Sequence, residues 1–128
     1  MNRRIAPRRL NMALVVVALS VAVLAVACTP ALPPETPGII GTVTSLVAGD
    51  ERPASILVEG GKQPAGALAD KASVTISPST QLFAADGSKT NASGIVKGAT
   101  VKVWFEGPVA ESYPVQGSAK VVQIVATP

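Results

Sequence analysis

The sequence predicts an all-β fold, a small five-stranded OB-like barrel or open sheet, preceded by an N-terminal signal helix and a proline-rich tether. Five short segments after residue 37 alternate apolar and polar side chains or form short apolar runs, which is typical of strands. Clusters rich in glycine and proline separate them. No long helical pattern lies outside the N-terminus, and a small open sandwich is the alternative architecture.

The first 27 residues have the organisation of a lipoprotein signal peptide. Residues 1–11 carry four arginines and no acidic residue, and residues 12–27 form an apolar run interrupted only by Ser20. A basic region, a short apolar stretch and small residues before a cleavage point are typical of a secretory signal. The alternative, a permanent membrane helix, is less favoured because this run is shorter than the ~20 residues of a membrane span.

The only cysteine, Cys28, directly follows this run. Ala25, Val26 and Ala27 before it resemble a bacterial lipobox, although Leu24 stands one place earlier than the motif prefers. The sequence therefore predicts that Cys28 is lipidated and that the protein is anchored to the bacterial membrane on its extracytoplasmic side. A single cysteine also excludes an intramolecular disulfide.

Residues 28–37 are expected to form the lipidated cysteine and a stiff tether, because residues 29–37 contain four prolines. Seven basic and eight acidic residues follow Cys28, which gives the mature chain a net charge of −1. The excess of basic residues in the whole sequence belongs to the signal. We therefore expect no nucleic-acid partner, because such binding requires a clustered basic face in the folded domain.

Residues 38–128 are expected to form one OB-like β domain. The strands are predicted at residues 38–47, 54–59, 71–77, 100–106 and 118–126, with 81–83 as a short continuation of the third. Gly41 predicts a bulge or a tight bend, and the last strand is expected to carry a bulge or to be buried on both sides. Residues 84–98 are either a helical turn that closes one end of the barrel or a loop.

Alternation also assigns the side chains to faces. The expected core residues are Val74, Ile76, Val101, Val103 and Phe105. Replacement of Phe105 by alanine is therefore expected to cost about 3–5 kcal/mol. Trp104 points to the other face, where it is either exposed or covered by another segment. Gly107-Pro108 is expected to end this strand, because proline has no N–H for the ladder.

The sequence lacks most catalytic residue types. It contains no histidine, and its one cysteine is assigned to lipid, which excludes Ser-His-Asp and Cys-His sites and zinc sites built on these residues. We therefore expect no catalytic activity, no metal and no cofactor. An accessory or weak hydrolase of the cell envelope that uses Glu106 and Glu111 as a carboxylate pair is the alternative.

The segment 101–116 is the best candidate for binding, because it holds three of the four aromatic residues. Candidate binding residues there are Trp104, Glu106, Glu111, Tyr113 and Gln116. Aromatic side chains on a loop of a rigid barrel predict a non-enzymatic module for a small ligand or an envelope protein. In the alternative interpretation, Tyr113 packs over Trp104 as a small core. The bond between Tyr113 and Pro114 is also a candidate for the cis form.

The C-terminal third resembles the YobA-like family of uncharacterised small bacterial exported proteins and lipoproteins. The resemblance rests on Gly98, Val101, Val103, Trp104, Phe105, Gly107, Glu111, Ser112, Tyr113, Pro114, Gln116 and Ala119, with Gly38 and residues 56–58 extending it. This resemblance implies an OB-like barrel of unknown function and implies no activity.

Overall fold

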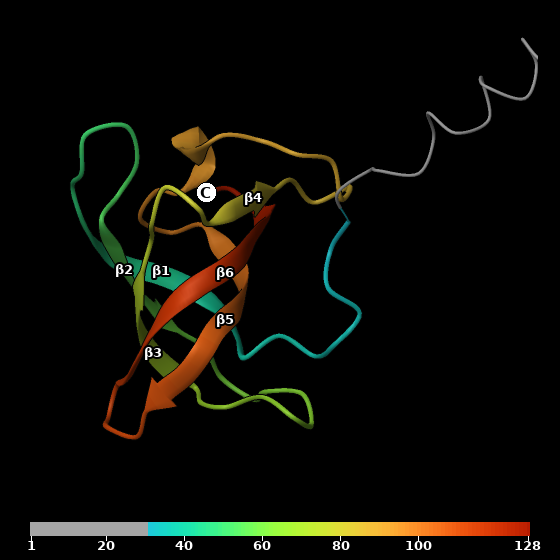
Figure 1. Ribbon diagram of the computed structural model, residues 1–128, viewed down its shortest axis with the longest axis vertical. Helices are drawn as coiled ribbons and strands as arrows, with labels where there is room; N and C mark the ends of the chain where they lie inside the picture. The colour runs from blue at the N-terminus through green and yellow to red at the C-terminus, as the bar shows by residue number, and fades with distance from the viewer. Residues whose placement is uncertain (1–30) are drawn as a thin grey trace, which may run out of the picture. The chain divides into compact units, whose positions relative to one another are not determined.

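The computed structural model describes residues 31–128, so the predicted signal peptide and Cys28 lie outside the described residues. The strands are β1 (Ile39–Val47), β2 (Ser55–Glu59), β3 (Lys71–Thr75), β4 (Gln81–Phe83), β5 (Thr100–Ala110) and β6 (Val115–Ala126) (Figure 1). A single 3-10 turn, η2 (Ala92–Gly94), lies between β4 and β5. Within this part of the chain, no helix has the length and hydropathy needed to cross a membrane.

Five of the strands close into a barrel. β1, β2 and β3 pair antiparallel in sequence order, and β5 pairs antiparallel with both β1 and β6. The ring is completed by β3 and β6, which run parallel from the pair Ala72 and Val115 to the pair Thr75 and Ser118. β4 adds a sixth strand beside β6. The predicted OB-like barrel is thus confirmed, and the open alternatives are excluded.

The barrel interior is filled by the apolar side chains that alternation assigns to it. Val74, Val101 and Val103 are fully buried, and Ile76 is 6% exposed, as predicted. Ile95, which directly follows η2, is 2% exposed and belongs to the same cluster. The irregular stretch before β5 therefore contributes a side chain to the core, as the helical-turn alternative expected.

Gly41 allows β1 to approach the end of β2 closely. A Cβ atom at this position would lie 2.5 Å from the carbonyl oxygen of Glu59 and 2.8 Å from the amide nitrogen of Gly60. Backbone atoms cannot move aside as a flexible side chain can, so only glycine fits here. The pairing of β1 with β5 is regular at Gly41, and the irregular register of β1 lies between Val43 and Ser45.

The prediction that Gly107-Pro108 ends the fourth predicted strand is wrong, because β5 continues to Ala110. Glu106 pairs with Ser118 and Ala110 pairs with Gln116, so residues 107–109 lie in a bulge between these two pairs. Residues in a bulge have no cross-strand hydrogen-bond partner, so proline, which lacks an N–H, is tolerated at position 108. Gly107 supplies the positive φ of 69° that the bulge requires.

Phe105 points inward as predicted, but it is half-buried rather than part of the sealed core. It lies at one end of the barrel against Gly38 and Gly117, where a Cβ atom on Gly117 would be 2.8 Å from the ring. The ring therefore covers backbone at the mouth of the barrel. The predicted loss of about 3–5 kcal/mol for Phe105→Ala is too large for this position, because the side chain is only partly removed from water.

A second, smaller apolar cluster lies on the outside of the barrel. It contains Phe83, Trp104 and Val121, with Leu32 packed against it. Residues 31–37, which we call the strap, run beside this cluster before β1 begins (Figure 1). The Trp104 Nε1–H donates a 2.8 Å hydrogen bond to the carbonyl oxygen of Glu35. The strap thus contacts the barrel and does not act as a free spacer over these residues.

Candidate functional site

The most exposed large hydrophobic side chain among the described residues is Tyr113, in the loop between β5 and β6, with 73% of its surface accessible. The loop is short, and the bond between Tyr113 and Pro114 is cis. The Ser112 hydroxyl donates to the carbonyl oxygen of Pro114 at 2.8 Å. The Lys71 ammonium lies 5.9 Å from the centre of the Tyr113 ring, a cation–π geometry. Tyr113 is therefore an oriented aromatic surface that faces solvent.

A polar face of the barrel begins next to Tyr113. Cross-strand pairs place Leu57 of β2 beside Ser73 of β3, and Ser73 beside Gln116 of β6. Thr75 pairs in the same way with Ser118. These five residues share the outer side of the sheet, and we call this surface the barrel face. It presents hydroxyl and amide groups around one aliphatic side chain.

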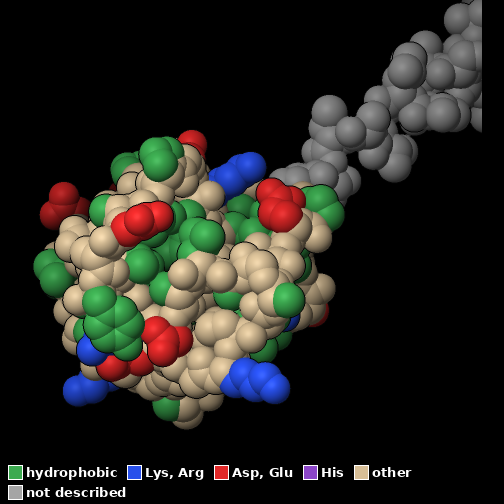
Figure 2. Space-filling view, turned by 90° about the horizontal axis from the view of Figure 1, so that it is seen from below, with side chains coloured by type: hydrophobic (Ala, Val, Ile, Leu, Met, Phe, Trp, Pro, Cys, Tyr) green, Lys and Arg blue, Asp and Glu red, His purple; other side chains and the backbone are tan. Residues whose placement is uncertain are grey.

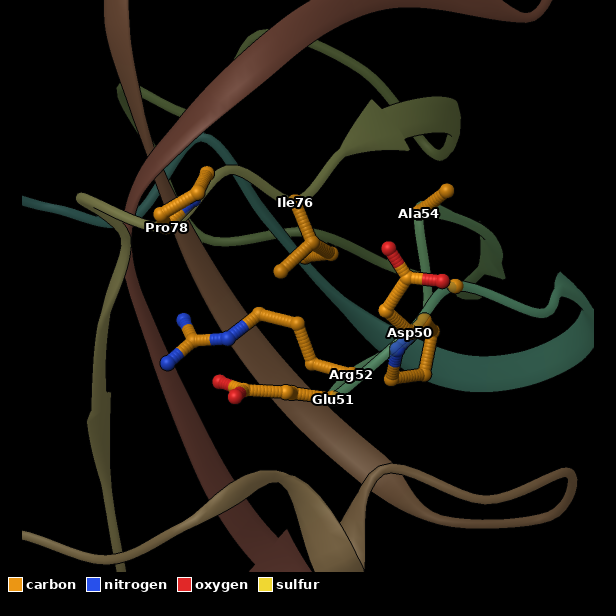
Figure 3. A pocket seen from close by; sticks show the side chains of 8 residues that line it. Asp50, Glu51, Arg52, Ala54, Ile76 and Pro78 are labelled. Carbon is orange, nitrogen blue, oxygen red and sulfur yellow. The ribbon is translucent and has the colours of Figure 1, made fainter.

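The β1–β2 loop lies at the opposite end of the barrel face. Residues 49–54, together with Ile76 and Pro78, line an open pocket of about 450 Å³ there (Figure 3). Arg52 Nη1 donates to the carbonyl oxygens of Ser77 at 3.2 Å and of Thr80 at 3.0 Å, which holds the loop against the turn between β3 and β4. The barrel face therefore lies between two loops, the arrangement that OB-type barrels use for ligand binding.

Of the other candidate residues, Glu106, Glu111 and Gln116 are exposed. Glu106 belongs to β5, whereas Glu111 lies in the hairpin loop and lines an apolar hollow of about 300 Å³ with Leu68 and Pro108. Figure 2 shows hydrophobic side chains in the middle of the lower side of the molecule, with charged side chains around them.

Trp104 is only 7% exposed, so of the two alternatives for this residue the covered one is present. Its cover is the strap and not Tyr113, because the cluster around the indole consists of Phe83, Val121 and Leu32. Trp104 therefore offers no free ring for stacking. Its place on the outer side of β5 agrees with the predicted alternation.

Several residues of this surface, including Arg52, Lys71, Ser73 and Thr75, are not among the site residues predicted from the sequence. The alternating polar positions of the third strand indicate that Ser73 and Thr75 point outward. Only the parallel pairing of β3 with β6 brings them beside Gln116 and Ser118. Across residues 31–128 there is no group of three or more histidine, cysteine or acidic side chains arranged to hold a metal ion.

Glu59 and Lys71 form an ion pair at the Tyr113 end of the barrel face, with 3.1 Å between Oε1 and Nζ. The Thr44 hydroxyl and then the Lys71 ammonium lower the pKa of Glu59 below its ordinary value of 4.5. The pKa of Glu59 is lower in the folded state than in the unfolded state, so its ionised carboxylate stabilises the fold at pH values above the unfolded-state pKa. This stabilisation is lost as the pH falls through the folded-state pKa.

Lys71→Met is therefore expected to raise the pKa of Glu59 part of the way back toward 4.5, since the Thr44 hydroxyl stays in place. The measurement is an NMR titration of the Glu59 carboxyl carbon. Lys62→Met, which changes the same charge on the exposed β2–β3 loop, is the matched control. An equal shift in both variants would show that the pair is not responsible.

Comparison with known proteins identifies the family of this chain. Residues 49–126, more than half of the chain, match the family described as "Protein of unknown function (DUF3221)". Searches of curated proteins and of solved structures found no match. The matched range includes β2 to β6, the barrel face and Tyr113. The chain therefore belongs to the DUF3221 family of proteins of unknown function.

Proposed function

We propose that the protein is a lipid-anchored, extracytoplasmic binding module of the bacterial envelope, without enzymatic activity, and that its barrel face binds an uncharged glycan segment beside Tyr113. The observation that carries this proposal is the 73% exposed Tyr113 ring, oriented by Lys71 at the edge of a polar sheet surface. Exposed aromatic rings stack on the apolar faces of sugars, and neighbouring hydroxyl and amide groups bond to sugar hydroxyls.

The charges around the barrel face favour an uncharged ligand. Asp50 and Glu51 stand at one end, and Glu59 and Glu111 stand at the other. These acids disfavour a phosphate backbone, which is one of the two polymer types that OB-type barrels bind at this surface. An oligosaccharide, the other type, carries no such penalty.

The membrane anchor rests on the sequence of the N-terminus. A basic segment, an apolar run and the small residues before Cys28 match a lipoprotein signal. Stable anchoring requires more than one acyl chain or an additional attraction to the lipid surface. We infer a diacylated Cys28 and an outward-facing domain.

We also infer that the chain is a YobA-like member of its family. The segment that carries this resemblance, residues 98–119, lies inside the matched range 49–126. It includes all of β5, the hairpin loop with Tyr113 and the first part of β6. The resemblance therefore concerns the part of the barrel that bears the proposed site.

Tyr113→Ala in the mature chain with Cys28→Ser is expected to weaken binding on an array of envelope glycans about tenfold, which corresponds to about 1.4 kcal/mol. Its melting temperature is expected to stay unchanged, because Tyr113 is mostly in water. Tyr113→Phe keeps the ring and is expected to keep most of the binding. Val96→Ala, which shortens an exposed aliphatic side chain between η2 and β5, is the matched control.

Three results would contradict this proposal. Binding that is unaffected by Tyr113→Ala would exclude the aromatic surface. Capture of an envelope protein that persists after glycan removal would identify a protein ligand instead. Turnover of an envelope polymer that Glu106→Gln alone abolishes would favour the hydrolase alternative.

A further inference from the structure

The side of the barrel that carries the strap has a row of cross-strand neighbours with a lysine at each end. Lys102 of β5 pairs with Gln123 of β6, Gln123 pairs with Phe83 of β4, and Phe83 pairs with Lys89. Paired residues in a sheet point to the same side, and Phe83 belongs to the outer cluster. The two lysines therefore lie on the outer surface, separated by three strand spacings or roughly 14 Å.

A third lysine lies next to this row. Trp104 pairs with Val121 and Phe105 pairs with Ala119, so Lys120 is the extra residue of a bulge in β6. It is exposed and lines a hollow of about 210 Å³ together with Glu35 and Trp104. The strap side thus displays three lysines on three different segments.

Three acidic residues share this side with the lysines. Glu35 lies on the strap, and Asp86 accepts bonds from the amide and hydroxyl of Ser88 in the loop before Lys89. Glu106 lies on the same outer side of β5 as Lys102 and Trp104. The strap side therefore holds three basic and three acidic residues, whereas the other charged residues after Cys28 are four basic and five acidic, so this side is the less acidic part of a chain whose net charge is −1.

The strap also limits how far this side can be from the lipid anchor. Leu32 packs on the outer cluster, and the Glu35 carbonyl is bonded to Trp104. Leu32 is only four positions after Cys28. A fully extended chain of that length reaches about 14 Å between Cα atoms, half of what a free tether of ten residues would span.

We propose that the strap side of the barrel, with Lys89, Lys102 and Lys120, lies against the anionic headgroups of the membrane. The proposal rests on the proposed lipidation of Cys28. An acyl anchor combined with basic residues near the surface is a recognised way to hold a protein on anionic lipid. β5 lies across the barrel from β2 and β3, and Figure 1 shows the strap on the side away from these strands. This orientation leaves the barrel face open to the envelope.

The test uses the lipidated protein with one added cysteine, since the thiol of Cys28 is consumed by lipid. Gln81→Cys places a label on the strap side, where exposed Gln81 pairs with Val121. Ser45→Cys places the matched label on exposed β1, beside Leu57. Each variant is labelled with a polarity-sensitive dye and reconstituted into vesicles of phosphatidylcholine with phosphatidylglycerol. The Gln81 dye is expected to emit at shorter wavelength and to be less quenched by iodide than the Ser45 dye.

A charge exchange tests the lysines. Lys102→Glu with Lys120→Glu is expected to remove much of this difference, as is a high salt concentration. Lys62→Glu with Lys97→Glu, the same charge change elsewhere, is expected to preserve it. Equal quenching at the two labels in an anchored protein would overturn the proposal. Protection of Gln81 in native membranes but not in vesicles would also overturn it, in favour of a protein partner.

Membrane fractionation before labelling shows whether a negative result contradicts the lipid anchor or only the proposed orientation of the barrel. A chain that carries no lipid and leaves the membrane fraction contradicts the anchor, and it contradicts the orientation as well. An anchored chain without a difference between the labels contradicts the orientation alone.

Discussion

Trp104→Ala is expected to lower the free energy of unfolding by about 3–5 kcal/mol. The substitution removes an indole that is 7% exposed and packs on Phe83, Val121 and Leu32. It also removes the Nε1–H donor that holds the Glu35 carbonyl. Urea unfolding of the mature chain with Cys28→Ser, followed by circular dichroism, measures the change. Faster proteolysis of the strap is expected as well, because its main anchor is lost.

Two further substitutions make this result interpretable. Trp104→Phe keeps an aromatic ring and loses the donor, so its cost from the hydrogen bond is expected to be about 0.5–1.5 kcal/mol. Phe105→Ala removes a half-buried ring at the mouth of the barrel and is expected to cost less than Trp104→Ala. A larger loss for Phe105→Ala would mean that Phe105, and not Trp104, is the principal aromatic side chain of the packed structure.

Cys28→Ser is expected to move the protein from the membrane fraction to the soluble fraction, or to leave it as an unprocessed precursor. Each buried CH₂ group of an acyl chain contributes about 0.8 kcal/mol, and two chains anchor a protein stably where one chain binds only reversibly. Without the thiol neither chain has an attachment point. Detergent phase partitioning and incorporation of labelled fatty acid measure the effect.

Thr29→Ala, at the next position, is the control and is expected to stay lipidated. If Cys28→Ser left the detergent partitioning unchanged, the anchor would have to be the apolar run of residues 12–27 itself. The uncleaved chain would then be visible by its mass, because the signal peptide would still be present.

The sequence alone determined where most of the strands lie and which side of a strand most of their residues occupy, although β5 and β6 extend beyond their predicted bounds and β4 is a separate strand. The alternation in 71–77 and in 101–105 correctly assigned Val74, Val101 and Val103 to the interior and Trp104 to the outer side. These properties are local, since successive side chains of a strand point to opposite faces whatever lies around them. For Tyr113 the sequence left two alternatives, exposed or packed over Trp104, and the structure has the exposed one.

Tertiary structure alone decided what covers each face and where the strands meet. Trp104 is buried because Glu35, 69 positions earlier, accepts its hydrogen bond and Leu32 packs beside it. The barrel face exists because β3 and β6, which are separated in the chain by β4, η2 and β5, pair in parallel. β5 passes through Gly107-Pro108 because its bulge has no cross-strand partner there. Periodicity specifies the direction of a side chain, whereas its cover depends on contacts between residues far apart in the chain.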